Sequence, residues 1–516
     1  MSTEKVRVRF APSPTGPLHM GGVRTALYNY LFAKKHDGTF ILRVEDTDQT
    51  RFVPGAEEYI IDALAWCGIS PDEGQGVGGS YGPYKQSERK AMYRQYADQL
   101  VASGHAYYAF DTADELNDMR ERAKQAKMPN WQYNSITRSN MKNSLTLSTD
   151  EVKERINKGD EYVIRIKIPR NEEVRFHDEI RGWVVVNTAN MDDKVLFKSD
   201  GMPTYHLANI VDDHLMQITH VIRGEEWLPS APLHVLLYRY LDWESTMPKF
   251  AHLPLILKPD GNGKLSKRDG DRLGFPVFPL EWKDPASGEI SSGYRENGYF
   301  SGAFVNMLAF LGWNPGTSQE LFSLTELVEA FTLERVGKSG AKFDPDKTRW
   351  YNQQYLRAQE NNTLAQELKP MLAEQGVKDI SADALEKYCE LMKERAVFVA
   401  DMMEGMYVFK KPGTYDEKTI RKKWKTRTPE LLTELADRFN QLTVFEAQAI
   451  ETCFKEFLTE KEVGMGAVMP NLRVVLTGVG MGPSLFHIIE LLGKEETLGR
   501  IQEGLKSIAK MAHASN

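Results

Sequence analysis

Two short stretches carry residues suited to binding phosphate groups. PSPTGPLHMGG, residues 12–22, places His19 and the adjacent Gly21 and Gly22 between an alternating stretch and a helical one. Glycines let a phosphate or a planar group come close to the backbone, and the positive end of the following helix attracts an anion. KLSKR, residues 264–268, follows the glycine-rich KPDGNG and concentrates positive charge. A flexible loop of that charge could close over a polyphosphate and stabilise departing pyrophosphate.

Each stretch also has a simpler interpretation. Prolines and glycines can build a stiff strand-to-helix turn without any ligand, and KLSKR alone is more typical of a solvated loop. Two other phosphate motifs fail in their context. GQGVGG, residues 74–79, follows a helix end, and Gly263-Lys264 precedes Leu265 where a P-loop has Ser or Thr. A dinucleotide fingerprint and a Walker-type ATPase are therefore disfavoured.

The patterns around these stretches predict a parallel sheet. Strand and helix patterns alternate through the first part of the chain, which is the signature of βαβ units. The strand patterns are VRVRF (6–10), FILRVEDTD (40–48) and ITHVIRGEEW (218–227), and the helical ones begin at Arg24 and cover 54–68, 205–214 and 228–241. Between 107 and 202 the rhythm changes to a polar helical section followed by EYVIRIKIP, GWVVVN and KVLFKSDG. We expect one nucleotide-binding domain that an antiparallel insertion splits in sequence.

Beyond about residue 304 the chain has helical patterns throughout. Apolar residues recur three and four apart, often behind a Ser or Thr suited to capping a helix. The clearest examples are SLTELVEAF, TLAQELKPMLAEQG, TPELLTELADRFNQL and TVFEAQAIETCFKEFL. We predict an all-α C-terminal region.

Composition limits the class of protein. A chain of 516 residues with 41% hydrophobic residues is long enough for several domains. No apolar run approaches the roughly 20 residues that span a bilayer, and the N-terminus is unlike a signal peptide, so we expect a cytoplasmic protein without a membrane partner. Three dispersed cysteines predict neither a disulfide nor a structural zinc site. A formal net charge of -7 argues against indiscriminate binding to nucleic acid.

HMGG and KLSKR resemble the two signature motifs of class I aminoacyl-tRNA synthetases, in the right order on either side of an insertion. RFAPSPTGPLHMGG, LRVEDTD, PTYHLANIVDDH and VIRGEEW are similar to the corresponding stretches of bacterial glutamyl-tRNA synthetases. The resemblance extends to about Asn352, weakens, and returns in LRVVLTG and PSLFHIIELLGKEE. It implies ATP-dependent attachment of L-glutamate to the 3′ end of its tRNA through a glutamyl-adenylate.

The family resemblance also implies the fold class and the domain order. The fold is α/β and all-α: a Rossmann-like class I catalytic domain split by an α+β insertion, then an all-α anticodon-binding region. We expect the first catalytic half at 1–106, the tRNA acceptor-binding insertion at 107–202, the second catalytic half at 203–256, the KLSKR and stem-contact region at 257–350, and the anticodon-binding region at 351–516.

The ATP site follows from the two motifs. His19, at the helix entrance, suits a donor to phosphate, and Gly21 and Gly22 suit close approach of the nucleoside. Lys264 and Lys267 suit the pyrophosphate end, so His19 and these lysines are the expected catalytic residues. The resemblance adds Glu226 and Trp227 as ATP contacts.

The glutamate site follows from arginines at strand ends. Arg9 and Arg223 end parallel strands, where ligands of open α/β sheets bind, and an arginine matches a carboxylate with two hydrogen bonds. The resemblance implies both arginines and Tyr205 in the pocket, with Ser13 and Glu45 at the α-amino group. Asn209 shares the helix face of Tyr205 and is included.

Two alternatives stay open for these side chains. Glu45 and Asp46 could form ion pairs with Arg43 or Arg51. Arg223 could pair internally with Glu225 or Glu226.

Substrates and cofactors follow from the same resemblance. We expect ATP with Mg²⁺, L-glutamate and the cognate tRNA as partners, and a monomer. The insertion lacks the cysteine cluster that some family members use for zinc, so we predict no metal site there. The segment after KLSKR is longer than the family pattern, and its GFPVFPLEW suggests an ordered surface insertion.

Other assignments are less favoured. Glutaminyl-tRNA synthetases share both signatures but end in β-barrels, and a glutamyl-queuosine-type paralogue lacks the C-terminal region. A catalytically inactive tRNA-binding relative would have little need of both intact motifs.

Overall fold

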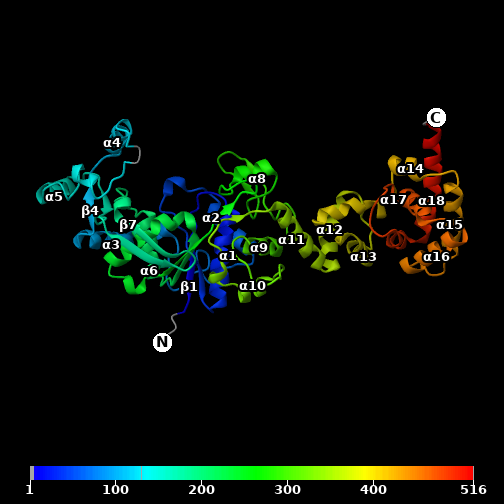
Figure 1. The fold of residues 1–516 in the computed structure, drawn as a ribbon, viewed down its shortest axis with the longest axis horizontal. Helices are drawn as coiled ribbons and strands as arrows, with labels where there is room; N and C mark the ends of the chain where they lie inside the picture. The colour runs from blue at the N-terminus through cyan, green and yellow to red at the C-terminus, as the bar shows by residue number, and fades with distance from the viewer. Residues whose placement is uncertain (1–4, 129–130, 515–516) are drawn as a thin grey trace. The chain divides into compact units, whose positions relative to one another are not determined.

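The computed structural model describes residues 5–128 and 131–514, with side chains described to residue 510. The chain divides into two compact units, Met1–Thr348 and Arg349–Asn516. The division falls inside helix α11 (Pro345–Ala358). The first unit contains the sheets and the second is helical (Figure 1).

A seven-stranded sheet forms the centre of the first unit as it is described. Its strand order is β3-β2-β1-β9-β10-β6-β7. The pairs from β3 to β6 are parallel, and only the edge strand β7 runs antiparallel to its neighbour. The strands are β1 (Arg7–Phe10), β2 (Thr39–Leu42), β3 (Glu73–Gly74), β6 (Glu173–Asp178), β7 (Gly182–Asn187), β9 (His220–Gly224) and β10 (Lys249–Leu253). This order confirms a sheet that the chain leaves and later rejoins.

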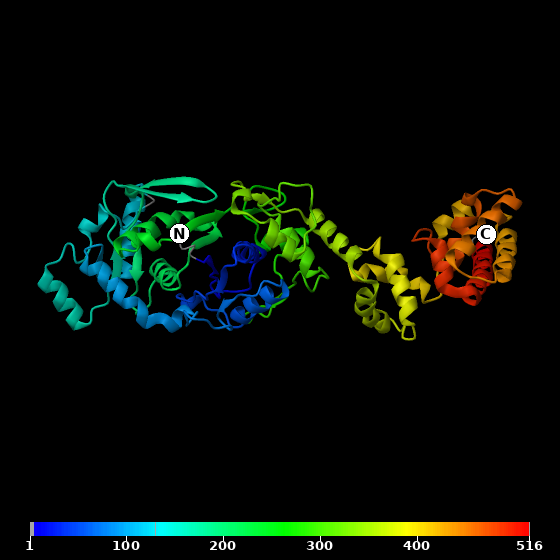
Figure 2. The ribbon, with the colours of Figure 1, turned by 90° about the horizontal axis from the view of Figure 1, so that it is seen from below.

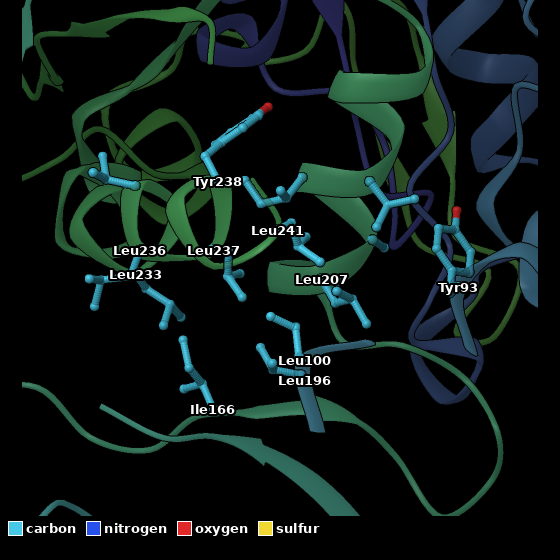
Figure 3. Close-up of a cluster of buried hydrophobic side chains, with 14 of the residues drawn as sticks. Tyr93, Leu100, Ile166, Leu196, Leu207, Leu233, Leu236, Leu237, Tyr238 and Leu241 are labelled. Carbon is cyan, nitrogen blue, oxygen red and sulfur yellow. The ribbon is translucent and has the colours of Figure 1, made fainter. Parts of the chain in front are cut away.

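Helices lie between the parallel strands along the chain, as crossover connections require, and one further helix, α3 (Lys90–Ala102), leads from β3 to the smaller sheet. The others are α1 (Met20–Lys35), α2 (Ala56–Trp66), α6 (Tyr205–Leu215) and α7 (Ala231–Tyr240). Leucines of α6 and α7 meet residues of α3 and of strands β5 (Val163–Ile166) and β8 (Val195–Phe197) in one buried cluster (Figure 3). Fully burying a leucine side chain stabilises the fold by about 1.5 to 3 kcal/mol. The cluster therefore holds α6 against α7, α3 and β8.

A smaller antiparallel sheet forms the insertion. Its strands are β4 (Ala106–Ala109), β5 and β8, and it carries α4 (Ala113–Gln125) and α5 (Thr149–Lys158). GWVVVN, expected in this insertion, instead forms β7, which pairs with β6 at the edge of the main sheet (Figure 2). The reason is that β6 pairs with β10, which comes from a distant part of the chain. Because β7 is hydrogen-bonded to β6, it becomes the edge strand of the same sheet.

The region after β10 contains the KLSKR stretch and the long surface segment. It comprises β11 (Ile256–Leu257), α8 (Lys267–Leu273), β12 (Trp282–Lys283), β13 (Ile290–Ser291), α9 (Ser301–Ala309), α10 (Leu324–Ala330) and β14 (Ala341–Lys342). The predicted ordered insertion is confirmed: β12 and β13 form a hairpin, and the hydroxyl of Tyr59 on α2 donates to the carbonyl of Leu280 at 2.6 Å. Trp282 packs edge-on against the same tyrosine.

The second unit is built from helices alone across its described residues (Figures 1 and 2). After α11 they are α12 (Asn361–Glu374), α13 (Ala382–Lys393), α14 (Glu417–Lys423), α15 (Thr428–Gln441), α16 (Ala447–Glu460), α17 (Met465–Thr477) and α18 (Leu485–Ala514). α18 breaks at Gly493, whose φ of 74° is left-handed backbone that glycine adopts at low cost. The predicted all-α region is confirmed from α11 onward, but its expected start near residue 304 was too early, because β14 at Ala341–Lys342 pairs with β11. Across the described residues, no helix has the length and apolar character needed to span a membrane.

Candidate functional site

A cavity of about 1120 Å³ lies where β1 and β9 end beside the start of α1. Ligands of open α/β sheets bind beyond the carboxyl ends of the strands. Every residue that the sequence assigned to ATP or glutamate lines this cavity: Arg9, Ser13, His19, Gly21, Gly22, Glu45, Tyr205, Asn209, Arg223, Glu226, Trp227, Lys264 and Lys267. The fold therefore brings the two sequence motifs and both arginines to one place.

His19 caps helix α1. Its Nδ1 accepts a hydrogen bond from the backbone N–H of Gly21 at 3.1 Å, so the helix starts at Met20 and not at Arg24 as expected. Because Nδ1 accepts, the proton of the neutral ring resides on Nε2. Nε2 is buried and has no partner among the described residues. Burial, and then the nearby Lys264, lower the pKa of His19 to about 4. His19 is thus a neutral donor on the cavity wall.

The two glycines of HMGG have different surroundings. A side chain at Gly22 would meet Leu18 Cδ1 at 2.5 Å, closer than real contacts allow, whereas one at Gly21 would meet the His19 ring at 3.6 Å and Ile256 Cδ1 at 3.9 Å, which are ordinary contacts. A side chain at Gly22, in the first turn of α1, would therefore need Leu18 to move. Both glycines line the cavity, and Gly21 has the more open surroundings.

Both lysines of KLSKR line the cavity and form ion pairs with glutamates. Lys264 donates to Glu226 at 2.7 Å, and Lys267 donates to Glu289 of the β12–β13 hairpin at 2.9 Å. The lysine side chains are 57% and 38% exposed. Burial alone would raise the pKa of Glu226, but the hydrogen bond from Lys264 brings it below its ordinary value. Exposed pairs of this kind contribute only about 0 to 1 kcal/mol, so a ligand can displace them.

Arg9 belongs to a buried charge network. Its Nε and Nη2 donate to the two carboxylate oxygens of Asp213 at 3.0 and 3.2 Å. Arg43, fully buried, donates to the same Asp213 at 2.7 Å and to Glu45 at 2.8 Å. Burial alone would raise the pKa of Asp213, but Arg9 and Arg43 lower it below its ordinary value. The charge of Arg9 is therefore already balanced within the protein.

Glu45 forms the internal pair that the sequence left as an alternative. Its Oε1 accepts from Arg43 and also from Asn209 Nδ2 at 3.0 Å. Burial raises the pKa of Glu45, although Arg43 and Arg9 oppose that shift. Glu45 nevertheless lines the cavity.

Arg223 has a different environment. Its Nε donates to His252 Nε2 at 3.1 Å and its Nη1 to the Tyr205 hydroxyl at 2.8 Å. The alternative partners are engaged elsewhere, since Glu225 pairs with Arg181 and Glu226 with Lys264. Within the part of the chain that the structure describes, no carboxylate pairs with Arg223. This cation lies 5% exposed on the cavity wall without a counter-charge of its own.

Tyr205, Asn209 and Ser13 complete the predicted set. Tyr205 and Asn209 extend from the same face of α6, and the Tyr205 ring packs against Trp227 with centroids 4.5 Å apart. Ser13 lies at the exposed rim. The sequence reasoning missed Asp213, His252 and Glu289. Two of them carry a signal in the sequence: Asp213 stands within ANIVDDH and His252 within KFAHLPLIL, so each is a polar group among apolar residues. A buried polar group needs a partner, and that need could have indicated both.

The described residues contain no group of three or more His, Cys, Asp or Glu side chains arranged to hold a metal ion. The three cysteines are free and buried. Burial raises the pKa of each thiol, so each packs as a small apolar side chain.

Comparison with protein families gives two adjoining matches. The profile described as "tRNA synthetases class I (E and Q), catalytic domain" matches residues 5–350, and the "Anticodon binding domain" profile matches residues 363–505. Together the two profiles cover most of both structural units.

Whole-length relatives carry one name. The glutamate–tRNA ligase of Cytophaga hutchinsonii is 58% identical over 99% of each chain, and that of Christiangramia forsetii is 57% identical over 98% of this chain and 100% of its own. A crystal structure of a glutamate tRNA ligase from Elizabethkingia meningosepticum, in complex with its amino acid, is 50% identical and superposes with a TM-score of 0.94. It covers 98% of this chain and 99% of its own.

Proposed function

The chain belongs to the glutamate–tRNA ligases, class I aminoacyl-tRNA synthetases, and on this premise we propose that it activates L-glutamate with ATP and transfers it to the 3′ end of its tRNA. The observation that carries the assignment to this cavity is its polarity. One end presents Arg223, a buried cation without a carboxylate partner, and the other presents a neutral donor, His19, beside exposed lysines. A substrate with a carboxylate at one end and a polyphosphate at the other matches both.

The first step joins glutamate to ATP. The α-carboxylate attacks the α-phosphorus, the bond to the β-phosphate bridging oxygen breaks, and pyrophosphate leaves as glutamyl-adenylate forms. Arg223 supplies the counter-charge for the γ-carboxylate, with Tyr205 holding the guanidinium. Arg9 can donate to the same γ-carboxylate only through Nη1, because its Nε and Nη2 already donate to Asp213. Asn209 and Arg43 both contact Oε1 of Glu45, so Oε2 serves the α-amino group together with Ser13.

The phosphate end acts on charge that develops in the transition state. His19 donates through Nε2, Gly21 leaves room for the nucleoside, and Glu226 and Trp227 border the nucleoside side. Lys264 and Lys267 exchange their ion pairs with Glu226 and Glu289 for the departing pyrophosphate. Preorganised donors and cations aimed at developing charge are usually the largest catalytic term.

The second step transfers glutamate to tRNA. A hydroxyl of the terminal ribose attacks the adenylate carbonyl, and AMP leaves. We assign residues 107–202 to the acceptor end and 257–350 to the stem, between the catalytic halves 1–106 and 203–256 and the anticodon-binding region 351–516. The match of the anticodon-binding profile to residues 363–505 supports the last assignment.

Metal, assembly and location complete the proposal. Mg²⁺ would enter with ATP, bound through the substrate's own phosphates, and would neutralise part of their charge. Zinc would play no part. The proposed enzyme acts as a monomer, and its need for ATP and tRNA places it in the cytoplasm with translation.

ATP/pyrophosphate exchange tests this function directly. Exchange is measured with glutamate and with glutamine, each with and without tRNA, and charging of tRNA is measured on the same preparation. Glutamate-dependent exchange and charging are the expected result. Silence with glutamate in both conditions, together with retained tRNA binding, would instead indicate a tRNA-binding relative without catalysis.

A further inference from the structure

Arg223 stands apart from the other buried arginines of the catalytic unit in how it is held. Arg9, Arg43 and Arg89 each donate to a buried aspartate, at 2.7 to 3.0 Å. Arg24 lacks a carboxylate as well, but backbone carbonyls of Leu311 and Pro254 accept from both of its Nη atoms. Arg223 alone in this group is oriented mainly by neutral side chains, with the Trp227 carbonyl accepting from its Nη2 at 3.4 Å, and it faces the cavity.

The group that fixes the Arg223 Nε is an imidazole. His252 on β10 is the register partner of Arg223 on β9, so the two side chains leave neighbouring strands side by side. His252 Nε2 accepts from Arg223 Nε at 3.1 Å, and His252 Nδ1 lies 2.6 Å from the carboxylate of Asp178 at the end of β6. His252 and Asp178 are both fully buried.

The hydrogen-bonding capacity of the three groups determines the tautomer of His252. A guanidinium can only donate, so Nε2 must accept, and an ionised carboxylate can only accept, so Nδ1 must carry the proton. Asp178 also accepts from the backbone N–H groups of Ile180 and Arg181 at 3.0 and 2.8 Å, which holds the carboxylate in place. The chain Asp178–His252–Arg223 therefore has one arrangement of protons.

An imidazole at this position orients the arginine without neutralising it. A carboxylate bound directly to Arg223 would compete with the carboxylate of the substrate, as Asp213 occupies Arg9. With Asp178 one imidazole away, Arg223 keeps its charge for a ligand, and its Nη1 is held by the Tyr205 hydroxyl and near His234 Nδ1 at 3.4 Å. A fixed, uncompensated cation favours a carboxylate over an amide of the same shape.

We propose that Asp178 and His252 are positioning residues that hold Arg223 in the orientation required to select a carboxylate side chain over its amide. They act through Arg223 and do not contact the substrate. The proposal rests on the assignment of Arg223 to the γ-carboxylate of glutamate.

Two substitutions of His252 separate its two contacts. An asparagine amide coincides with the Nδ1 end of a histidine, and a glutamine amide with the Nε2 end. His252→Asn keeps a donor for Asp178 but removes the acceptor for Arg223, so kcat/KM for glutamate should fall about tenfold, mainly through KM, with glutamine little changed. His252→Gln keeps an acceptor for Arg223 and should stay within about threefold of wild type.

The control is His220→Asn, the same substitution on β9 at a histidine that bonds to Thr219 and packs on Phe32 instead of on Arg223. It should leave the ratio of glutamate to glutamine unchanged. Equal losses in His252→Asn and His252→Gln, with KM for ATP raised as well, would reduce His252 to a packing residue and overturn the proposal.

A measurement on the unmodified protein reports the tautomer itself, and it needs a variant only to assign the signal. In protein labelled with ¹⁵N-histidine, the His252 ring, assigned by its loss in His252→Gln, should be neutral with the proton on Nδ1. A ring protonated on Nε2 would contradict the proposal.

Arg223→Gln separates this proposal from the assignment beneath it. If Arg223→Gln changes the ratio of glutamate to glutamine while His252→Asn does not, Arg223 reads the carboxylate without help from the pair, and the positioning role fails alone. If Arg223→Gln leaves the ratio unchanged, the assignment of Arg223 fails and the positioning role fails with it.

Discussion

The arginine end and the lysine end of the cavity handle positive charge in opposite ways. Arg9 and Arg43 are at most 3% exposed and share Asp213, whereas Lys264 and Lys267 are 57% and 38% exposed and pair with separate glutamates. Charges taken out of water are usually paired with an opposite charge, because an unpaired buried charge costs several kcal/mol. Arg223 is the exception at this end, since a histidine, a tyrosine and a backbone carbonyl accept its hydrogen bonds and no carboxylate does among the described residues. Charges left in water can change partners at little cost. Under the proposed function, the first arrangement suits recognition of one substrate group, and the second suits a loop that exchanges its partners as pyrophosphate leaves.

Removing the shared carboxylate should have the largest effect on stability. Asp213→Asn leaves Arg9 and Arg43 without their common partner in the interior, so the catalytic unit should lose about 3 to 5 kcal/mol of unfolding free energy. Urea denaturation measures the loss. Glu289→Gln, which breaks an exposed pair, is the matched control and should change stability by less than about 1 kcal/mol. Similar losses of unfolding free energy in both variants would contradict the difference between the buried arginine end and the exposed lysine end.

Lys267→Ala tests the lysine end in catalysis. The account predicts a loss in kcat of about two orders of magnitude or more, with KM for glutamate and the melting temperature unchanged, because the lysine is exposed and acts on developing charge. Steady-state charging of tRNA gives both constants. A variant with a rate near that of the wild type would mean that KLSKR is a solvated loop.

His19→Asn tests the neutral donor. Asparagine can still cap α1 but lacks the Nε2 donor, so kcat should fall about ten- to a hundredfold. With the His19 pKa lowered to about 4, the ring is uncharged at pH 6 and at pH 8, and the defect should be the same at both. A defect that grows toward pH 6 would show that the imidazolium is the donor.

Glu289→Gln should have the smallest effect. Without the partner on the β12–β13 hairpin, Lys267 is available to ATP, and KM for ATP should decrease by about two- to fivefold at low salt. The difference should shrink at high salt, because exposed pairs are screened. Glu281→Gln on the same insertion, which does not pair with Lys267, is the control. An unchanged KM for ATP at low salt would mean that the Glu289–Lys267 pair does not affect ATP binding.

The sequence could predict which residues line this cavity together, because each group of them is marked by a local pattern. HMGG lies between a strand and a helix, KLSKR follows a glycine-rich lead, and Arg9 and Arg223 lie near the ends of strand patterns. Parallel strands align their carboxyl ends, so residues far apart in the chain could be expected in one cavity. The capping role of His19 was missed because Gly21 and Gly22 were interpreted as a turn, whereas a well-capped helix accepts them in its first residues.

Contacts between distant elements were beyond the sequence. The pairing of β6 with β10 decides that the β6–β7 hairpin joins the main sheet, and no local pattern reports which strand is a neighbour. The same pairing brings Asp178 to His252, and the β9–β10 register brings His252 to Arg223. Glu289 reaches Lys267 through a hairpin whose position depends on packing against α2.

The central claim is that the buried arginine end chooses the amino acid. The most direct test is kcat/KM of Arg223→Gln for glutamate and for glutamine, with the melting temperature measured on the same preparation. The account predicts that kcat/KM for glutamate falls about ten- to a hundredfold, that glutamine changes much less, and that the melting temperature is nearly kept, since Arg223 pairs with no carboxylate among the described residues. An unchanged ratio of the two substrates, with a lowered melting temperature, would contradict it.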